Sequence, residues 1–291
     1  MPEQSLLVGP GWLGAATAEH LVAAGHAVWT LQRSAGEPPA GCVAVVGDIT
    51  SAATDPALRA ALPDTIDHLV VCVAPSTARG DSFAMYPAAA RGAVALAAAL
   101  GVRHVLYVSS TGVYDRRDGS EVSEATPIEP TSPRVQTLLD AELAIAEAVG
   151  HGMRADIVRA AGLYGPGRDP AGRFVRSAVP PDTWCNFSWR DDVAEAIRHL
   201  LSQPGEVAFR VYNCTDGHPV QAEAITRALT GAPPTPLAET AAEGRVTAGR
   251  SSQRIRVDAL RATGWQPAVP TIFEGLRRLG HALPGLEPSA T

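Results

Sequence analysis

Four hydroxyl side chains stand close together immediately after an apolar run. The segment YVSSTGVYD, residues 107–115, carries Ser109, Ser110, Thr111 and Tyr114. A hydroxyl can donate a hydrogen bond to a substrate oxygen, and a phenol can also transfer a proton. A buried strand that ends in such groups is therefore a candidate reaction centre. The pattern GxSxG of serine hydrolases is absent, which disfavours Ser110 as a covalent nucleophile.

A glycine-rich loop lies near the start of the chain, between an apolar run at residues 5–8 and a helical pattern at residues 12–24. Its sequence GPGWLG fits the pattern GxGxxG in the context where that pattern binds dinucleotides. The first glycine permits the turn, the second admits a pyrophosphate, the third allows close packing, and the helix N-terminus supplies amide donors. A tight turn without a ligand is the alternative. The predicted cofactor contacts are Gly9, Gly11, Trp12, Leu13 and Gly14.

The end of the next predicted strand, residues 27–31, indicates which nicotinamide cofactor the loop would bind. An acidic residue there binds the ribose hydroxyls of NAD, whereas an arginine accommodates the additional phosphate of NADP. Gln32 occupies the acidic position, and Arg33 and Ser34 follow it. A guanidinium and a hydroxyl suit a phosphate dianion, so we expect NADP as the cofactor, with NAD as the less favoured choice.

Two further segments follow predicted strands and would extend the cofactor site. Asp48 follows the strand predicted at residues 42–46 and either caps the adenine amino group or closes an ordinary turn. Ala74 and Pro75 end the strand predicted at residues 68–73 and are expected to pass beneath the nicotinamide ribose.

Strands and helices alternate along the first part of the chain. Beyond the strands already named, β-prone runs occur at residues 104–108 and 155–159, and helical patterns occur at 87–100 and 133–149. This alternation predicts an α/β fold with a Rossmann-type, doubly wound parallel sheet. We expect a dinucleotide-binding domain over residues 1–165, to which residues 186–214 return, and a small C-terminal substrate-binding lobe formed by residues 166–185 and 215–291.

Composition disfavours several classes of function. The 291 residues are 46% hydrophobic and 19% charged, and a net charge of −6 offers no basic surface for nucleic acid. No apolar run reaches the roughly 18 residues that a membrane span needs, and the N-terminus resembles no secretion signal, so we expect a cytoplasmic protein. Four cysteines without CxxC spacing and eight histidines without ligand-type spacing predict packing or surface roles, and no metal site.

The motifs, in this order, resemble the extended short-chain dehydrogenase/reductases of the NAD-dependent epimerase/dehydratase superfamily. Besides GPGWLG and SSTGVYD, the resemblance rests on AAGLYGPGRDP at residues 160–170, NFSWRDDVAEAI at 186–197 and the closing stretch at 254–276, so it covers nearly the whole chain. It implies a Rossmann-type fold, a nicotinamide cofactor, a small-molecule substrate and, in many members, a homodimer. It also implies that Ser110 orients the substrate oxygen.

The same resemblance exposes a departure from the family pattern. In the family, a tyrosine moves the proton, and a lysine four residues later lowers its pKa and holds the nicotinamide ribose. Aligning SPR with the usual SPY puts Arg134 at the tyrosine position and Leu138 at the lysine position. A guanidinium does not deprotonate in proteins, and leucine has no proton to give. The sequence is thus similar to the atypical subgroup of the superfamily, for which the fold does not imply the reaction.

Several residues remain as candidates near the expected nicotinamide. Tyr114 is the nearest phenol in the sequence, although in the family this tyrosine often packs beside the substrate. Arg134 would clamp a carboxylate or phosphate or stabilise an oxyanion, or it pairs with a helix carboxylate such as Glu142. The resemblance implies that Tyr164 lines the nicotinamide pocket, and that substrate contacts come from Asn186, Trp189 and Arg190.

Three functions follow from these residues. The favoured one is an NADP(H)-dependent oxidoreductase of a small metabolite, with an anionic group suited to Arg134, which reduces a carbonyl or imine or oxidises an alcohol. Ser110, Tyr114 and Arg134 would be its catalytic residues. The second is an epimerase, dehydratase or cyclisation catalyst that uses the cofactor transiently or structurally. The third is a non-enzymatic NADP sensor, which the missing tyrosine and lysine would permit.

Overall fold

The computed structural model describes the chain except for residues 1, 76–81, 177–178, 206, 234–250 and 287–291. It divides into two compact units. Unit 1 comprises Met1–Val113, Pro130–Arg159 and Val193–Tyr212, and unit 2 comprises Tyr114–Glu129, Ala160–Asp192 and Asn213–Thr291. The segment Tyr114–Glu129, which the sequence analysis placed in the dinucleotide-binding domain, therefore groups with unit 2.

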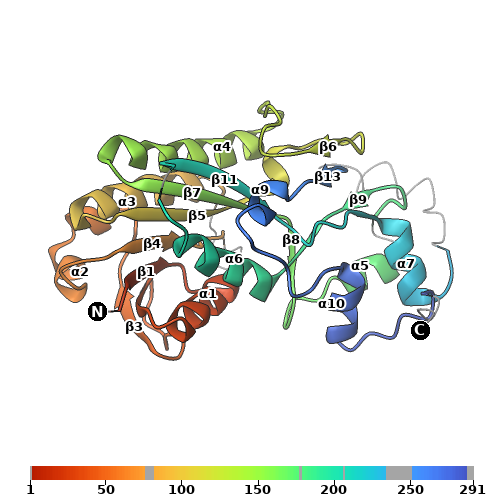
Figure 1. The fold of residues 1–291 in the computed structure, drawn as a ribbon, viewed down its shortest axis with the longest axis horizontal. Helices are drawn as coiled ribbons and strands as arrows, with labels where there is room; N and C mark the ends of the chain where they lie inside the picture. The colour runs from red at the N-terminus through yellow and green to blue at the C-terminus, as the bar shows by residue number, and fades with distance from the viewer. Residues whose placement is uncertain (1, 76–81, 177–178, 206, 234–250, 287–291) are drawn as a thin grey trace. The chain divides into compact units, whose positions relative to one another are not determined.

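Unit 1 is a Rossmann-type α/β fold built on a seven-stranded parallel sheet (Figure 1). The strand order is β11-β7-β5-β4-β1-β2-β3. The order reverses at β1, which pairs with both β2 and β4, so the carboxyl end of β1 is where such sheets bind dinucleotides. The predicted fold class is confirmed. The strands are β1 (Gln4–Val8), β2 (Ala27–Gln32), β3 (Cys42–Val46), β4 (His68–Val71), β5 (His104–Ser110), β7 (Arg154–Ala160) and β11 (Phe209–Cys214).

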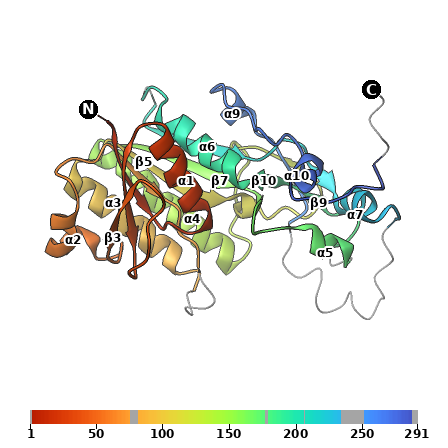
Figure 2. The same ribbon diagram turned by 90° about the horizontal axis from the view of Figure 1, so that it is seen from below.

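Helices cover both faces of this sheet, as the alternating sequence predicts. The helices α2 (Pro56–Ala61), α3 (Met85–Leu100) and α4 (Pro133–Ala146) share one apolar core with alternate strand residues such as Leu6 and Leu69. The intervening residues Leu7 and Val70 are equally buried. They belong to the other face, along which α1 (Trp12–Ala23) and α6 (Arg190–Leu201) run (Figures 1 and 2).

Local sequence fixes where the helices of the site begin and end. Ser132 caps α4 by accepting a hydrogen bond from the Val135 amide, and Pro133 occupies the first turn, where its missing N–H costs nothing. Gly101 ends α3 in the left-handed conformation, with φ at 66°. The α1 helix differs, because its N-cap is Gly11 and has no side chain with which to cap it.

Unit 2 consists of short elements around a small aromatic core formed by Tyr164, Phe174, Phe187 and Trp189. Two short strands pair in parallel within it, β8 with β10, and β9 pairs antiparallel with β12. The strands are β6 (Glu121–Val122), β8 (Gly162–Tyr164), β9 (Trp184–Cys185), β10 (Phe187–Trp189), β12 (Val220–Gln221) and β13 (Arg254–Ile255). The helices are α5 (Ala171–Val175), α7 (Ala222–Thr230), α9 (Asp258–Arg261) and α10 (Ile272–Arg278). No helix among the described residues of either unit has the length and apolar character needed to span a bilayer.

Candidate functional site

The glycine-rich loop joins β1 to α1 and has the geometry that a dinucleotide requires. Gly9 adopts a φ of +85°, and a Cβ at Gly14 would lie 2.1 Å from the Gly9 carbonyl oxygen, so side chains are excluded at both positions. At Gly11, in contrast, a Cβ would meet no atom within 4 Å. The first turn of α1, with Trp12 and Leu13, has no acidic residue. An open, uncapped helix N-terminus fits the pyrophosphate of a nicotinamide dinucleotide.

The ends of β2 and β3 present the residues predicted to select the cofactor. Arg33 and Ser34 are exposed directly after β2. The side-chain amide of Gln32 donates to the Gly36 carbonyl oxygen over 3.1 Å. Asp48 follows β3, and its Oδ1 accepts from the Thr50 amide at 2.9 Å and from the Thr50 hydroxyl at 2.8 Å. One oxygen of Asp48 therefore closes a turn, which is the alternative that the sequence left open.

The end of β4 lies against the glycine loop. A Cβ at Gly9 would be 2.9 Å from the Cys72 carbonyl oxygen, so the two loops are in backbone contact. Ala74 and Pro75 follow at once, the first exposed and the second half-buried. Burial raises the pKa of the Cys72 thiol to about 12, which keeps the thiol protonated and unreactive at neutral pH.

The two serine hydroxyls at the end of β5 have different hydrogen-bond partners. Ser109 is buried, and its hydroxyl donates to Glu142 Oε1 over 2.5 Å. The same carboxylate accepts from Nε of Arg159 at 3.0 Å and from its Nη2 at 2.6 Å, and both residues are buried. Glu142, a candidate partner for Arg134 on sequence grounds, thus pairs with Arg159. This buried charge pair, absent from the sequence-based site, holds β5, α4 and β7 together.

Ser110 lies half-buried one residue later, with a different set of neighbours. Its Oγ accepts from the Gly112 amide at 3.1 Å, which leaves the hydroxyl proton for another acceptor. A Cβ at Gly112 would lie 3.2 Å from Ser110 Oγ and 3.9 Å from both Arg134 Nη2 and Leu138 Cδ1. The Ser110 hydroxyl and the exposed Arg134 guanidinium therefore both lie within 4 Å of one point beside Gly112. Leu138 is buried next to them.

A phenol that sequence reasoning missed lies near Arg134. The Arg134 guanidinium carbon stands 5.3 Å from the ring centre of Phe83, which stacks on Tyr86. Burial raises the pKa of Tyr86, and the positive charge of Arg134 partly opposes that shift. The phenol is therefore neutral and can donate a proton or hydrogen bond at pH 7. Tyr86 lies in the first turn of α3, far from the hydroxyl segment in sequence, so only the fold reveals this proximity.

Two tyrosines predicted for the site are buried inside unit 2. The Tyr114 hydroxyl donates to Asn213 Oδ1 over 2.9 Å, and only 3% of the residue is exposed. Tyr164 is 1% exposed, and a Cβ at Gly275 would lie 2.0 Å from its hydroxyl. Burial also raises the pKa of the Tyr164 phenol well above its usual value. Both side chains are packed as core residues of unit 2.

The predicted substrate contacts also have partners inside unit 2. Asn186 donates from Nδ2 to the Gln253 carbonyl oxygen at 2.8 Å and accepts at Oδ1 from the Ile255 amide at 2.9 Å, so its amide anchors β13. Trp189 is 8% exposed and meets the ring of Tyr164 edge-on at 5.2 Å. Arg190 is half-buried and donates to Asp191 over 3.0 Å.

Comparisons with known proteins agree with this fold and with the glycine loop. A family model, the NAD dependent epimerase/dehydratase family, matches residues 6–215. Protein YeeZ of Escherichia coli strain K12 is 32% identical over 226 residues, which cover 74% of this chain and 78% of that protein. A solved structure from Methylobacillus flagellatus, named as a proposed NAD-dependent epimerase/dehydratase, is 29% identical with a TM-score of 0.72, over 96% of this chain and 98% of that one.

A more distant solved structure extends the likeness in fold. MoeE5, in complex with UDP-glucuronic acid and NAD, shares 22% identity and a TM-score of 0.74, over 94% of this chain and 96% of that one. The match of the family model over most of the chain, together with the YeeZ relative, establishes the family. The chain belongs to the NAD dependent epimerase/dehydratase family.

Proposed function

We propose that this protein is an NADP(H)-dependent oxidoreductase that reduces a carbonyl or imine, or oxidises the corresponding alcohol, of a small anionic metabolite. The observation that carries the proposal is that the Ser110 hydroxyl and an Arg134 guanidinium nitrogen both lie within 4 Å of one point beside Gly112. This pair lies at the carboxyl end of β5, and the glycine loop lies at the carboxyl end of β1 in the same sheet. A nicotinamide bound there would supply the hydride.

The two side chains have complementary tasks in this reaction. The Ser110 hydroxyl, whose lone pair is engaged by the Gly112 amide, donates a hydrogen bond to the substrate's carbonyl oxygen or imine nitrogen. Arg134 holds a carboxylate or phosphate of the substrate, or stabilises negative charge as it develops on the reacting oxygen. The arginine that replaces the family's tyrosine thus changes a proton donor into an anion-binding group.

For the proton itself, Tyr86 is a better-placed donor than Tyr114. The charge of Arg134 acts on Tyr86, whereas the Tyr114 hydroxyl is buried and bonded to Asn213. We therefore add Tyr86 to the proposed catalytic residues and treat Tyr114 as a structural one. Water or the substrate itself is the alternative source of the proton.

The preference for NADP rests on the end of β2. Arg33 and Ser34 are exposed there, and Gln32 replaces the acid that binds the ribose of NAD. The proposed cofactor contacts remain the glycine loop, Arg33, Ser34, Asp48, Ala74 and Pro75. Tyr164 is left out of this set because its hydroxyl is buried against Gly275 in unit 2.

A second candidate follows from the relatives. UDP-glucose 4-epimerase of Thermus thermophilus, solved with NAD, has the same fold at 20% identity and a TM-score of 0.73. An epimerase, dehydratase or cyclisation catalyst would use the cofactor without net oxidation. Net change in nicotinamide absorbance during turnover separates the two functions, because only the oxidoreductase produces one. A sensor without catalysis would bind NADP and turn over nothing.

The direct test is cofactor binding by isothermal titration calorimetry with NADPH and NADH. Wild type should bind NADPH more tightly, and Gly11→Ala should weaken that binding by at least about tenfold, since a methyl group blocks charge-assisted contacts to the pyrophosphate. Gly150→Ala is the matched control, because its Cβ would also meet no atom within 4 Å. Equal binding by wild type and Gly11→Ala would exclude the proposed cofactor site.

The proposal extends to location and assembly. Four free cysteines, of which Cys214 is buried, suit a reducing compartment, and we infer a cytoplasmic protein. The small-molecule substrate and the homodimer implied by the family resemblance remain predictions. Gel filtration with light scattering of the purified protein decides the assembly.

A further inference from the structure

The amino edge of the parallel sheet collects side chains that the proposed reaction does not use. In the register of the sheet, Gln4 of β1 faces Ala27 of β2, and Ser5 faces His68 of β4. Glu3 and His26 therefore precede two adjacent strands at the same level, and His68 starts a third. The parallel pairing of the strands brings these three residues together, and no local sequence motif links them.

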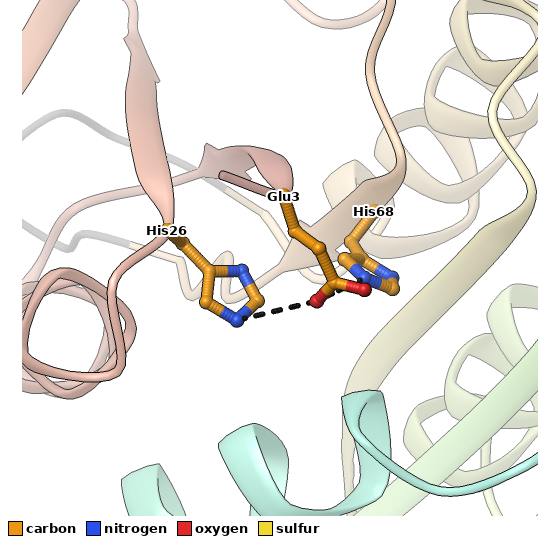
Figure 3. A group of neighbouring side chains, drawn as sticks. All are labelled: Glu3, His26 and His68. Atoms are coloured by element: carbon orange, nitrogen blue, oxygen red, sulfur yellow. Dashed lines mark hydrogen bonds and ion pairs between the residues drawn. The ribbon is translucent and has the colours of Figure 1, made fainter. Parts of the chain in front are cut away.

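Their side chains converge on one point (Figure 3). Oε2 of Glu3 lies 3.5 Å from Nε2 of His26 and 3.3 Å from Nε2 of His68. One ligand atom from each residue can be chosen so that all three lie within 4.8 Å of one another. The cluster is accessible from one side, because the Glu3 side chain is half-exposed while both imidazoles are largely buried.

The two separations from Glu3 match long ion pairs and also match the spacing of ligands around one ion. Charge-assisted hydrogen bonds between nitrogen and carboxylate oxygen are about 2.7–2.9 Å long. Ligand atoms about 2.0–2.2 Å from a tetrahedral zinc ion stand about 3.3–3.6 Å apart. Both distances from Glu3 to the histidines fall in the second range. Two imidazoles and one carboxylate also match the ligand set of zinc sites that keep a fourth position for water.

The surroundings hold the ring of His26 in a fixed orientation. Nδ1 of His26 lies 2.9 Å from the Ser5 hydroxyl, which can accept its proton and leave Nε2 directed at the Glu3 carboxylate.

Neighbouring charges do not block the cluster. Arg198 acts electrostatically on His26, but its guanidinium makes three hydrogen bonds of 2.6–3.0 Å to the Glu195 carboxylate. The ring of His68 meets that of His104 edge-on at 5.7 Å, and His104 in turn lies 3.0 Å from the buried Asp156. His104 and Asp156 extend the cluster along the sheet edge.

We propose that Glu3, His26 and His68 form a binding site for a zinc-class divalent cation at the amino edge of the sheet. The ion would take Oε2 of Glu3, Nε2 of each histidine and one water. Imidazole donors select zinc, nickel or copper over magnesium and calcium. The ion would link β1, β2 and β4 and so stabilise the sheet that carries the cofactor loop at its other edge. The site is independent of the proposed reaction.

Zinc titration of the full-length protein tests the site. Chelator-stripped protein is titrated with Zn²⁺ in competition with a chromophoric chelator, and Co²⁺ is added separately to record its visible spectrum. Wild type should bind one zinc ion, show the intense absorption of four-coordinate Co²⁺, and unfold at a higher temperature with zinc. Glu3→Gln should weaken zinc binding at least about tenfold, since even groups behind a ligand are worth about 10–100-fold.

Matched variants make the outcome decisive. Glu3 is half-exposed, so Glu3→Gln should fold normally even if His68→Asn, at a buried position, does not. His151→Asn, at an exposed histidine outside the cluster, should bind zinc as wild type does. Equal zinc affinity and equal Co²⁺ spectra for wild type and Glu3→Gln would assign the metal to other groups, such as cysteines, and overturn the proposal. So would Mg²⁺ binding as tight as that of zinc.

Discussion

The two edges of the sheet in unit 1 gather polar groups by different routes. At the carboxyl edge, Ser109 and Ser110 are consecutive in sequence, and Ser109 is fixed by the buried pair of Glu142 with Arg159. At the amino edge, Glu3, His26 and His68 come from three separate strand starts, and Glu3 is half-exposed. A sequence motif can predict the site at the carboxyl edge. The cluster at the amino edge is formed only by the register of the strands.

The difference also concerns what holds each edge in place. At the carboxyl edge, the buried carboxylate of Glu142 already has a guanidinium and a hydroxyl of the protein as its partners. At the amino edge, the distances of 3.3 Å and 3.5 Å leave the carboxylate without a short partner among these histidines. We therefore expect the stability of the protein to depend on substitutions at the carboxyl edge and on bound cations at the amino edge.

The largest effect should come from Glu142→Gln. The amide leaves the buried Arg159 charge uncompensated, which should cost about 3–5 kcal/mol of unfolding free energy. Glu3→Gln, measured in the presence of EDTA, should change it by no more than about 0.5 kcal/mol, as surface substitutions do. Urea unfolding followed by circular dichroism measures both. Similar values for the two variants would remove the contrast between the edges.

Ser110→Ala should come next and should affect catalysis alone. Loss of one hydrogen-bond donor to the reacting oxygen costs about 10²–10³-fold in kcat. The measurement is NADPH oxidation with a panel of 2-oxo acids, imines and nucleotide sugars, and NADPH affinity should stay unchanged. Thr137→Ala is a control on the same edge, because its hydroxyl bonds the Pro133 carbonyl within α4. A fully active Ser110→Ala would rule out the proposed role.

Removing the hydroxyl of Tyr86 and removing that of Tyr114 should have different effects. Tyr86→Phe should lower kcat by about 10²-fold or more if this phenol delivers the proton. Tyr114→Phe removes a buried hydrogen bond to Asn213 and should instead cost about 1–3 kcal/mol of stability, with little change in kcat. Steady-state kinetics and thermal unfolding of both variants provide the check. A larger loss of kcat in Tyr114→Phe would reverse the assignment.

The smallest effect expected is a change of cofactor preference. Arg33→Ala should weaken NADPH binding by about tenfold, the value of a charge-assisted contact, and leave NADH binding unchanged. Calorimetric titration with both cofactors measures the ratio. Arg103→Ala, immediately before β5 at the opposite edge of the sheet, serves as the control for overall charge. An equal loss of affinity for NADPH and for NADH would show that Arg33 does not bind the additional phosphate of NADP.

The sequence predicts the fold well because its signals are local. Alternating apolar runs and the glycine loop of Gly9, Gly11 and Gly14 predict the Rossmann-type sheet, and the strands observed begin and end close to their predicted positions. The candidate site is harder to predict, because its contacts are between distant segments. Nothing in the sequence pairs Glu142 with Arg159 or brings Tyr86 to Arg134.

The residue roles taken from the family resemblance remain predictions, and burial bears on several of them. Tyr114, Tyr164 and Trp189 look like pocket residues by motif, but each is at most 8% exposed. Asn186 donates one hydrogen bond to the Gln253 carbonyl and accepts one from the Ile255 amide. A motif indicates which residue type is present, whereas the number of partners that its polar atoms already have depends on packing.

The buried pair of Glu142 with Arg159 has a consequence for substitutions at position 138. Leu138 precedes Glu142 by one helical turn and is itself buried. A lysine reintroduced at position 138 would need to lose its hydration, and it would meet a carboxylate already bound by Arg159 and Ser109. We therefore expect that substituting Arg134 by tyrosine and Leu138 by lysine would not by itself give a working acid/base pair.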